Sequence, residues 1–151
     1  AKFDCGPAWD DMTLYGVKLP SEYRELKVLG KCIDVAPGSF QNGGNAYLWD
    51  CHGADWQKWF LEPGTGLIRS KHNPNFCLDS TNGNEDFTNV GIWVCENHPN
   101  LQWDVVGDTI RPRKNHALAL DINNANTDNG TNLQLYTADG NAAQQFSFGS
   151  N

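Results

Sequence analysis

The chain has 151 residues, a formal charge of −7 and 39% hydrophobic residues, among them six tryptophans and seven phenylalanines. This length and apolar content predict one folded domain with a sizeable core rather than a disordered chain. The negative charge argues against nucleic acid and anionic membranes as partners, because their phosphate groups would be repelled. No apolar run approaches the ~18 residues that insertion into a membrane as a helix requires.

The first 20 residues form an N-terminal arm that shares no pattern with the rest of the chain, so we expect the domain to occupy residues 21–151. The arm contains Cys5, the odd member of a set of five cysteines. An odd cysteine in a secreted chain indicates a free thiol or a bond to another chain. Cys5 is therefore a candidate for joining a disulfide-linked partner or a second copy of this chain, and both alternatives stay open.

From residue 21 onward, a set of landmarks recurs with a period of roughly 43 residues. The first unit carries, in chain order, Arg24, Cys32-Ile33-Asp34, Cys51 and Trp59. The second unit carries Arg69, Cys77-Leu78-Asp79, Cys95 and Trp103, and the third carries Arg111, Ala119-Leu120-Asp121, Ala138 and Phe146. Such a period indicates three structural units with the same internal plan.

Within each unit the apolar segments are short, as in "GLIRS", "FCLDS", "VGIWVC" and "NLQLYT". They are bounded by Asn, Gly, Pro and Asp, and this pattern predicts strands rather than helices. We therefore expect an all-β fold of three four-stranded units that close on a pseudo-threefold axis and leave few free edges. The side chains that we expect to point inward are Leu48, Ile92, Leu135, Trp59, Trp103 and Phe146.

Four of the cysteines form two pairs of similar spacing. Cys32 and Cys51 lie 19 residues apart and Cys77 and Cys95 lie 18 apart, whereas the third unit has alanine at both equivalent positions. Because the members of a pair are present or absent together, we predict two disulfides, each contributing ~3 kcal/mol, with free buried cysteines as the alternative. Disulfides indicate a secreted, extracellular protein. The absence of C-x-x-C spacing argues against a structural zinc site, and we expect no metal.

Together the landmarks resemble those of the ricin B-type (R-type) lectins and of family 13-like carbohydrate-binding modules. The family unit carries C-L-D, then G-x-x-V-Q-L-Y/W-x-C, then Q-x-W, and the third unit here reads "LALDINNANTDNGTNLQLYTADGNAAQQF". The resemblance covers roughly residues 21–149. It implies a β-trefoil and the binding of sugars, often galactose or N-acetylgalactosamine, in one shallow pocket per unit and without a cofactor.

A pyranose presents an apolar C–H face and a rim of hydroxyls, so its site needs a flat ring and a fixed acceptor. A carboxylate offers two oxygens and can accept two adjacent hydroxyls in charge-assisted bonds. This requirement explains why the third unit keeps its aspartate after losing its cysteines. An alternative is that the acids cap turns and the aromatics lie in the core. The expected acids and rings are Asp34 with Trp49, Asp79 with Trp93, and Asp121 with Tyr136.

The three predicted pockets differ from the family pattern and from one another. In the family, the Gln of Q-x-W holds the aspartate and the residue before it is an Asn that contacts the sugar. Here Trp56 and Ala143 replace that Asn, and Leu101 replaces the Gln in the second unit. His52 is either a further donor or an exposed loop residue. The additional predicted sugar-binding residues are His52, Gln57, Asn100, Gln134 and Gln144.

Catalysis finds no support in the sequence. The four histidines have no evident nucleophile beside them, and the acidic pairs Asp10-Asp11 and Glu85-Asp86 are sequence neighbours rather than groups facing each other across a cleft. We therefore predict a non-enzymatic, multivalent lectin with up to three pockets. Two alternatives remain: a binding subunit or glycan-targeting module of a toxin or glycoside hydrolase, and a protein-binding trefoil such as a protease inhibitor.

Overall fold

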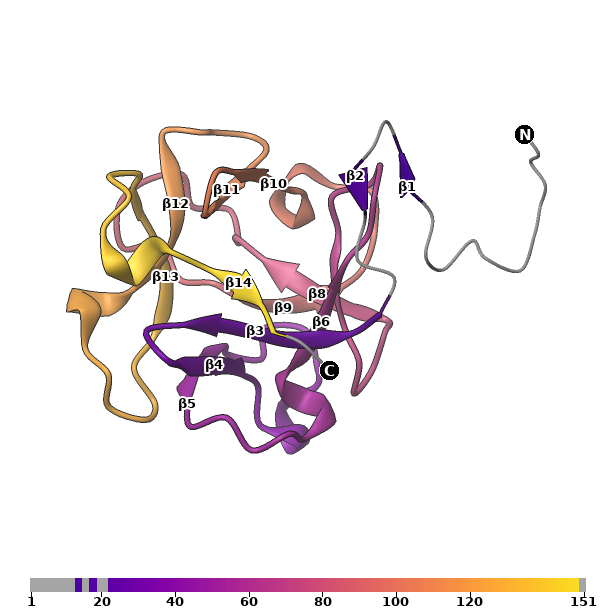
Figure 1. Cartoon of the computed structure of the whole chain (residues 1–151). Helices are drawn as coiled ribbons and strands as arrows, with labels where there is room; N and C mark the ends of the chain where they lie inside the picture. The colour runs from indigo at the N-terminus through magenta and orange to yellow at the C-terminus, as the bar shows by residue number, and fades with distance from the viewer. Residues whose placement is uncertain (1–12, 15–16, 19–21, 150–151) are drawn as a thin grey trace.

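The computed structural model describes residues 13–14, 17–18 and 22–149 (Figure 1). In the N-terminal arm, β1 (Thr13–Leu14) pairs with β2 (Val17–Lys18) in an antiparallel hairpin. Cys5 lies outside the described residues, so its predicted bond to another chain stays a prediction. The division into an arm of residues 1–20 and a domain of residues 21–151 likewise stays a prediction.

The domain is built from short strands and single 3-10 turns, and no α-helix occurs among residues 22–149. This all-β composition confirms the fold class predicted from the short apolar segments. The strands of the first unit are β3 (Arg24–Val28), β4 (Lys31–Asp34), β5 (Tyr47–Trp49) and β6 (Lys58–Leu61). Those of the second are β7 (Ile68–Ser70), β8 (Phe76–Asp79), β9 (Gly91–Val94) and β10 (Trp103–Val106). Those of the third are β11 (Thr109–Pro112), β12 (Leu118–Ile122), β13 (Leu133–Thr137) and β14 (Ser147–Phe148).

The three units join by pairing the last strand of one with the first strand of the next. β6 pairs with β7, β10 with β11, and β14 with β3, all antiparallel. The last of these pairs closes the ring, as Figure 1 shows where β14 lies against β3. Because each of these strands finds a partner, the closure satisfies backbone groups that an open sheet would leave at its edges. The architecture is the predicted β-trefoil.

The predicted inward layer is buried. Leu48, Ile92 and Leu135 are fully buried, and the aromatic landmarks Trp59, Trp103 and Phe146 are at most 7% exposed. Each indole also has a hydrogen-bond acceptor, since Trp59 Nε1 donates to Ile33 O and Trp103 Nε1 donates to Leu78 O, both at 3.1 Å. A buried aromatic side chain removes ~150–250 Å² from water, so this layer is a main source of stability.

Both predicted disulfides, Cys32–Cys51 and Cys77–Cys95, are present, with Cα–Cα distances of 5.1 and 5.2 Å. The third unit keeps a backbone hydrogen bond at this place, from Ala138 N to Ala117 O at 2.8 Å. The second unit makes the equivalent bond from Cys95 N to Asn75 O, also at 2.8 Å. The backbone geometry of this corner is therefore retained without the covalent link.

A ring of three asparagines surrounds the pseudo-threefold axis and was not predicted from the sequence. Asn45 Nδ2 donates to Asn132 Oδ1 at 3.0 Å, Asn89 Nδ2 to Asn45 Oδ1 at 3.0 Å, and Asn132 Nδ2 to Asn89 Oδ1 at 2.6 Å. Each asparagine stands three residues before the buried Leu or Ile of its unit, so its spacing follows the repeat. The ring ties the three units together through side chains, in addition to the strand pairs.

Candidate functional site

Three hairpins, β4–β5, β8–β9 and β12–β13, bring each predicted carboxylate and ring onto one face. Cys32 lies directly across from Trp49, Cys77 across from Trp93, and Ala119 across from Tyr136. Directly opposed residues in an antiparallel pair share a face, and so do residues two apart along a strand. The aspartate that follows each Cys or Ala by two residues is therefore beside the aromatic ring of the same hairpin.

The aspartates are buried, whereas the aromatic rings are at least partly exposed. Asp34, Asp79 and Asp121 are 3%, 7% and 4% exposed, so each carboxylate lies at the base of its hairpin face. Trp49 and Trp93 are 39% and 40% exposed, which is unusual for rings of this size. Tyr136 is half-buried. A buried acceptor with an exposed ring beside it is the arrangement that binding a pyranose requires.

In the third unit two glutamines hold the carboxylate. Gln144 Nε2 donates to Asp121 Oδ2 at 2.9 Å, and Gln134 Nε2 donates to Asp121 Oδ1 at 3.2 Å. Gln144 is fixed in turn, because its Oε1 accepts from Asp139 N at 2.9 Å. Burial raises the pKa of Asp121, and the two glutamine hydrogen bonds partly offset that effect. The pocket above has a volume of about 480 Å³ and is also lined by Tyr136.

In the second unit the carboxylate is held by backbone instead. Asp79 Oδ1 accepts from Thr81 N at 2.8 Å, while Leu101, at the glutamine position, is buried in a small apolar cluster. Burial raises the pKa of Asp79. The pocket has a volume of about 290 Å³, and its walls include Trp93 and Asn100.

A lysine from the third unit reaches this second pocket. Lys114 Nζ donates to Asn100 Oδ1 at 2.9 Å and to Thr81 O at 3.0 Å. Asn100 Nδ2 donates to Asn82 Oδ1 at 2.9 Å, so the side chain of Asn100 is held from both ends. The Lys114 charge favours the ionised form of Asp79 and opposes the effect of burial on the pKa of that carboxyl. The sequence pattern missed Lys114 because it belongs to another unit.

In the first unit protein groups already surround the carboxylate. Gln57 Nε2 donates to Asp34 Oδ2 at 2.8 Å, and His52 Nε2 lies 3.5 Å from the same oxygen. Tyr47, directly across the hairpin, hydrogen-bonds to Asp34 through its hydroxyl. Burial, followed by the negative charge of Asp34, raises the pKa of Tyr47 to about 12. The Tyr47 ring also meets the ring of Trp49 edge-on, with centroids 5.9 Å apart.

The residue that faces the aspartate across each hairpin thus differs among the units: Tyr47, Gly91 and Gln134. Glycine is required at position 91, because a Cβ there would lie 2.4 Å from Gly44 O. The acid is therefore covered by a phenol in the first unit, left open in the second and held by an amide in the third. The sequence signal was available, since all three residues stand two positions before the exposed aromatic.

A family model described as the ricin-type beta-trefoil lectin domain matches residues 22–146. The chain belongs to this family. The family is a carbohydrate-binding domain, and this membership agrees with the pairing of acid and ring on each hairpin. A comparison with curated protein sequences found no match.

Solved structures support the lectin domain assignment. The designed threefold-symmetric protein ThreeFoil is 28% identical, with a TM-score of 0.76 over 85% of this chain and 99% of its own. The C-terminal half of an earthworm R-type lectin, solved with N-acetylgalactosamine, is 25% identical, with a TM-score of 0.70 over 85% of this chain and 97% of its own. An agglutinin from Abrus precatorius is 26% identical, with a TM-score of 0.73 over 85% of this chain and 48% of its own.

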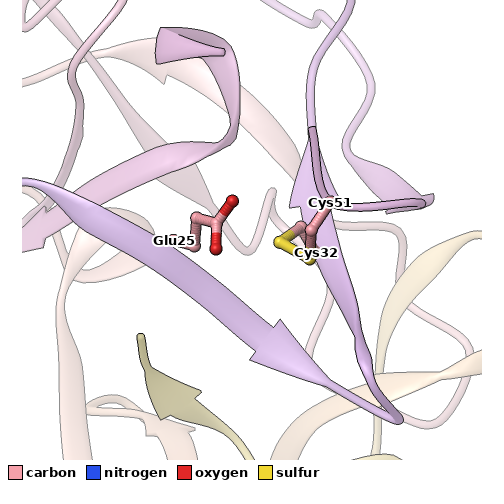
Figure 2. Close-up of side chains that lie close together, drawn as sticks. All are labelled: Glu25, Cys32 and Cys51. Carbon is pink, nitrogen blue, oxygen red and sulfur yellow. A yellow bond between two sulfur atoms is a disulfide. The ribbon is translucent and has the colours of Figure 1, made fainter. Parts of the chain in front are cut away.

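Two other features of the lectin domain lie outside the three hairpin pockets. Figure 2 shows Glu25 beside Cys32 and Cys51, and the ligand atoms of the three residues lie within 4.8 Å of one another. Both sulfurs belong to a disulfide, so neither is a thiolate that could bind a metal ion. A hollow of about 700 Å³ is lined in part by Tyr23 and Lys58 and contains none of the predicted sugar-binding residues. None of the helices in the described part of the chain has the length and hydrophobicity that spanning a bilayer demands.

Proposed function

We propose that the domain binds galactose- or N-acetylgalactosamine-type glycans without catalysing a reaction, and that the third pocket is its strongest site. The observation that carries this proposal is the environment of Asp121, a buried carboxylate held by Gln134 and Gln144 beside the ring of Tyr136. The earthworm lectin half solved with N-acetylgalactosamine supports the choice of sugar, as a relative of similar fold.

The two glutamine hydrogen bonds orient the Asp121 carboxylate and leave it able to accept further hydrogen bonds. Each oxygen of Asp121 accepts a hydrogen bond from one glutamine amide and Asn141 adds a further side-chain hydrogen bond, but a carboxylate has about four lone-pair sites, so capacity for a ligand hydroxyl remains. Bonds from hydroxyls to a carboxylate are charge-assisted and contribute ~1.5–3 kcal/mol each. Because Gln144 is fixed by the backbone at Asp139, the acceptor is oriented before the sugar arrives, which lowers the entropic cost of binding.

We expect the second pocket to bind sugar more strongly than the first. In the second, Asp79 faces Gly91, so no side chain from across the hairpin covers the acid, and Trp93 offers an exposed ring. In the first, Tyr47, Gln57 and His52 lie around Asp34, and the ring of Tyr47 across the hairpin reduces the access of a sugar hydroxyl to the acid. We therefore propose two working pockets and a weak or inactive first one.

A single shallow pocket of this kind binds one sugar with a dissociation constant of ~0.1–1 mM. Two pockets on one domain raise the apparent affinity for branched or clustered glycans by avidity. The two disulfides are compatible with an oxidising, extracellular location, and we propose glycans of cell surfaces or walls as targets.

A glycan array, read with calorimetric titrations of methyl galactoside, tests the proposal. Asp121→Asn should abolish most of the binding, Asp79→Asn should remove a second, smaller fraction, and Asp34→Asn should change little. Asp104→Asn is the matched control, because Asp104 pairs with Arg113 at 2.9 Å away from the hairpin faces. Failure of every saccharide to bind the wild-type domain would contradict the proposal.

A further inference from the structure

One residue departs from the threefold pattern at a place where the backbone makes the departure costly. Gly43, Phe87 and Gly130 occupy equivalent positions, and their φ angles are +90°, +70° and +94°. This left-handed region is open to glycine but strained for a bulky residue. Two units use the residue that the conformation favours, whereas the second unit places a phenylalanine there.

The backbone at this position has the same task in all three units. Gly43 N donates to Ile92 O at 2.9 Å, Phe87 N to Leu135 O at 2.8 Å, and Gly130 N to Leu48 O at 2.7 Å. Each loop thereby docks on the hairpin of a neighbouring unit. The contact requires only a backbone N–H, so the docking itself gives no reason for a phenylalanine.

The loop that carries Phe87 is held firmly on the third unit. Asp86 Oδ1 accepts hydrogen bonds from Thr137 N at 2.6 Å and from Thr137 Oγ1 at 2.8 Å. Within the loop, Thr88 Oγ1 donates to Glu85 O at 2.7 Å. These contacts on both sides of Phe87 maintain its strained conformation. Strain that the surroundings maintain in this way is typical of ligand sites.

The Phe87 ring stands at the mouth of the third pocket. It is 65% exposed and lies outside the core cluster of the described residues. It meets the Tyr136 ring at a centroid distance of 5.3 Å and an interplanar angle of 62°, and it lines the same pocket as Asp121. In the free protein, the small buried part of the Phe87 ring contributes little stabilisation. It therefore compensates neither for the backbone strain nor for the exposure of the rest of the ring to water. In the second pocket the equivalent wall is Gly43, which has no ring.

We infer that Phe87 is a specificity residue of the third pocket, against which the second sugar ring of a disaccharide packs when Asp121 and Tyr136 hold the first. This inference rests on the proposed function of that pocket. The third pocket then prefers disaccharides and longer glycans to monosaccharides, and the second pocket has no such preference. Because Phe87 belongs to the second unit, the preference of the third pocket for disaccharides depends on the packing of these two units in the trefoil.

Titrations of lactose and methyl galactoside into Phe87→Gly, followed by NMR at the side-chain amide of Gln134, test the inference at the third pocket alone. The lactose affinity should fall about three- to tenfold, as expected for the loss of one aromatic contact. The methyl galactoside affinity should change by less than about twofold, within the scatter of neutral surface substitutions. The variant should fold, because two units already have glycine at this position.

Two further variants complete the design. Phe87→Tyr keeps the ring and should retain the preference for lactose, whereas Val105→Ser removes another exposed apolar side chain, remote from the pocket lining, and should change neither affinity. An equal loss for both sugars in Phe87→Gly, or no loss for either, overturns the role of Phe87 while leaving the lectin function intact. If Asp121→Asn does not weaken methyl galactoside binding at Gln134, the proposed function of the pocket fails instead.

Discussion

Tyr47 lies directly across its hairpin from Asp34, and its hydroxyl hydrogen-bonds to that carboxylate. In the third unit the same register position is Gln134, which holds Asp121 by one amide hydrogen. The two residues occupy equivalent positions but leave different room for a ligand, since a tyrosine adds a ring over the acid. This single substitution accounts for the proposed difference between the first and third pockets.

Exchanging Tyr47 and Gln134 should create galactose binding in the first pocket and remove it from the third. Tyr47→Gln removes the ring that covers Asp34, so the number of galactose sites measured by calorimetry should rise by one. The reciprocal change, Gln134→Tyr, should close the third pocket and lower the site number by one. An unchanged site number in Tyr47→Gln, with the fold intact by circular dichroism, would show that Tyr47 does not control the first pocket.

Gln144 should matter for stability as well as for binding. Leucine fits at this position, as Leu101 does in the second unit, but it would leave the Oδ2 atom of Asp121 and the backbone N–H groups of Asp139 and Gly140 without the hydrogen bonds that Gln144 makes. We expect Gln144→Leu to lower the free energy of unfolding by ~1–3 kcal/mol, measured with denaturant. The exposed neighbour Gln145, replaced by leucine, is the control and should cost less than ~0.5 kcal/mol. Equal costs for the two variants would contradict a role for the buried amide.

When the solution is acidified, sugar binding should be lost at a higher pH than the folded structure. Burial raises the folded-state pKa of Asp79 and Asp121 above their ordinary value of 3.8. As the pH falls through this window above 3.8, protonation of these acids favours the folded state but removes the charge that binds hydroxyls. Circular dichroism should therefore remain native while the lactose affinity, measured by calorimetry, declines.

Asp104 provides the contrasting case. Its burial alone would raise its pKa, but hydrogen bonds from Arg113 and His116 outweigh that effect and lower the pKa below 3.8. The stability that these bonds give is present above pH 3.8 and is lost as the pH falls through the lower, folded-state pKa. Acid unfolding should thus follow the loss of binding. A lactose affinity that stays constant until the fold is lost would contradict this order.

The asparagine ring should contribute to the cohesion of the three units. Asn89→Ala removes one donor and one acceptor and should destabilise the domain by ~1–2 kcal/mol in denaturant unfolding. Asn97→Ala removes an exposed asparagine that bonds only locally, to Gln102, and should cost less than ~0.5 kcal/mol. Similar midpoints for the two variants would indicate that the ring is energetically neutral.

The sequence was sufficient for features that repeat within a unit. The buried layer of Leu48, Ile92 and Leu135 and the two disulfides follow from spacing, because each unit must satisfy the same core and the same hairpin. The pairing of acid and ring on one face follows from strand register, as between Asp79 and Trp93.

Contacts between units could not be derived in this way. Lys114 of the third unit hydrogen-bonds to Asn100 in the wall of the second pocket, and Phe87 of the second unit lines the third pocket. Their positions depend on how whole units pack against one another, and the period within one unit contains no information on that packing. Tyr47 was missed for a different reason: the family pattern has a glutamine at this position, which the third unit keeps as Gln134, and a tyrosine there does not match the pattern.

The central claim is that the carboxylate and the ring of one hairpin hold the same hexose. Nuclear Overhauser effects between the C–H protons of methyl galactoside and the ring protons of Tyr136 test it most directly. We predict such effects in the wild-type domain and their loss in Asp121→Asn with the fold retained. Effects that persist in Asp121→Asn, or that arise instead at the hollow beside Tyr23, would contradict the account.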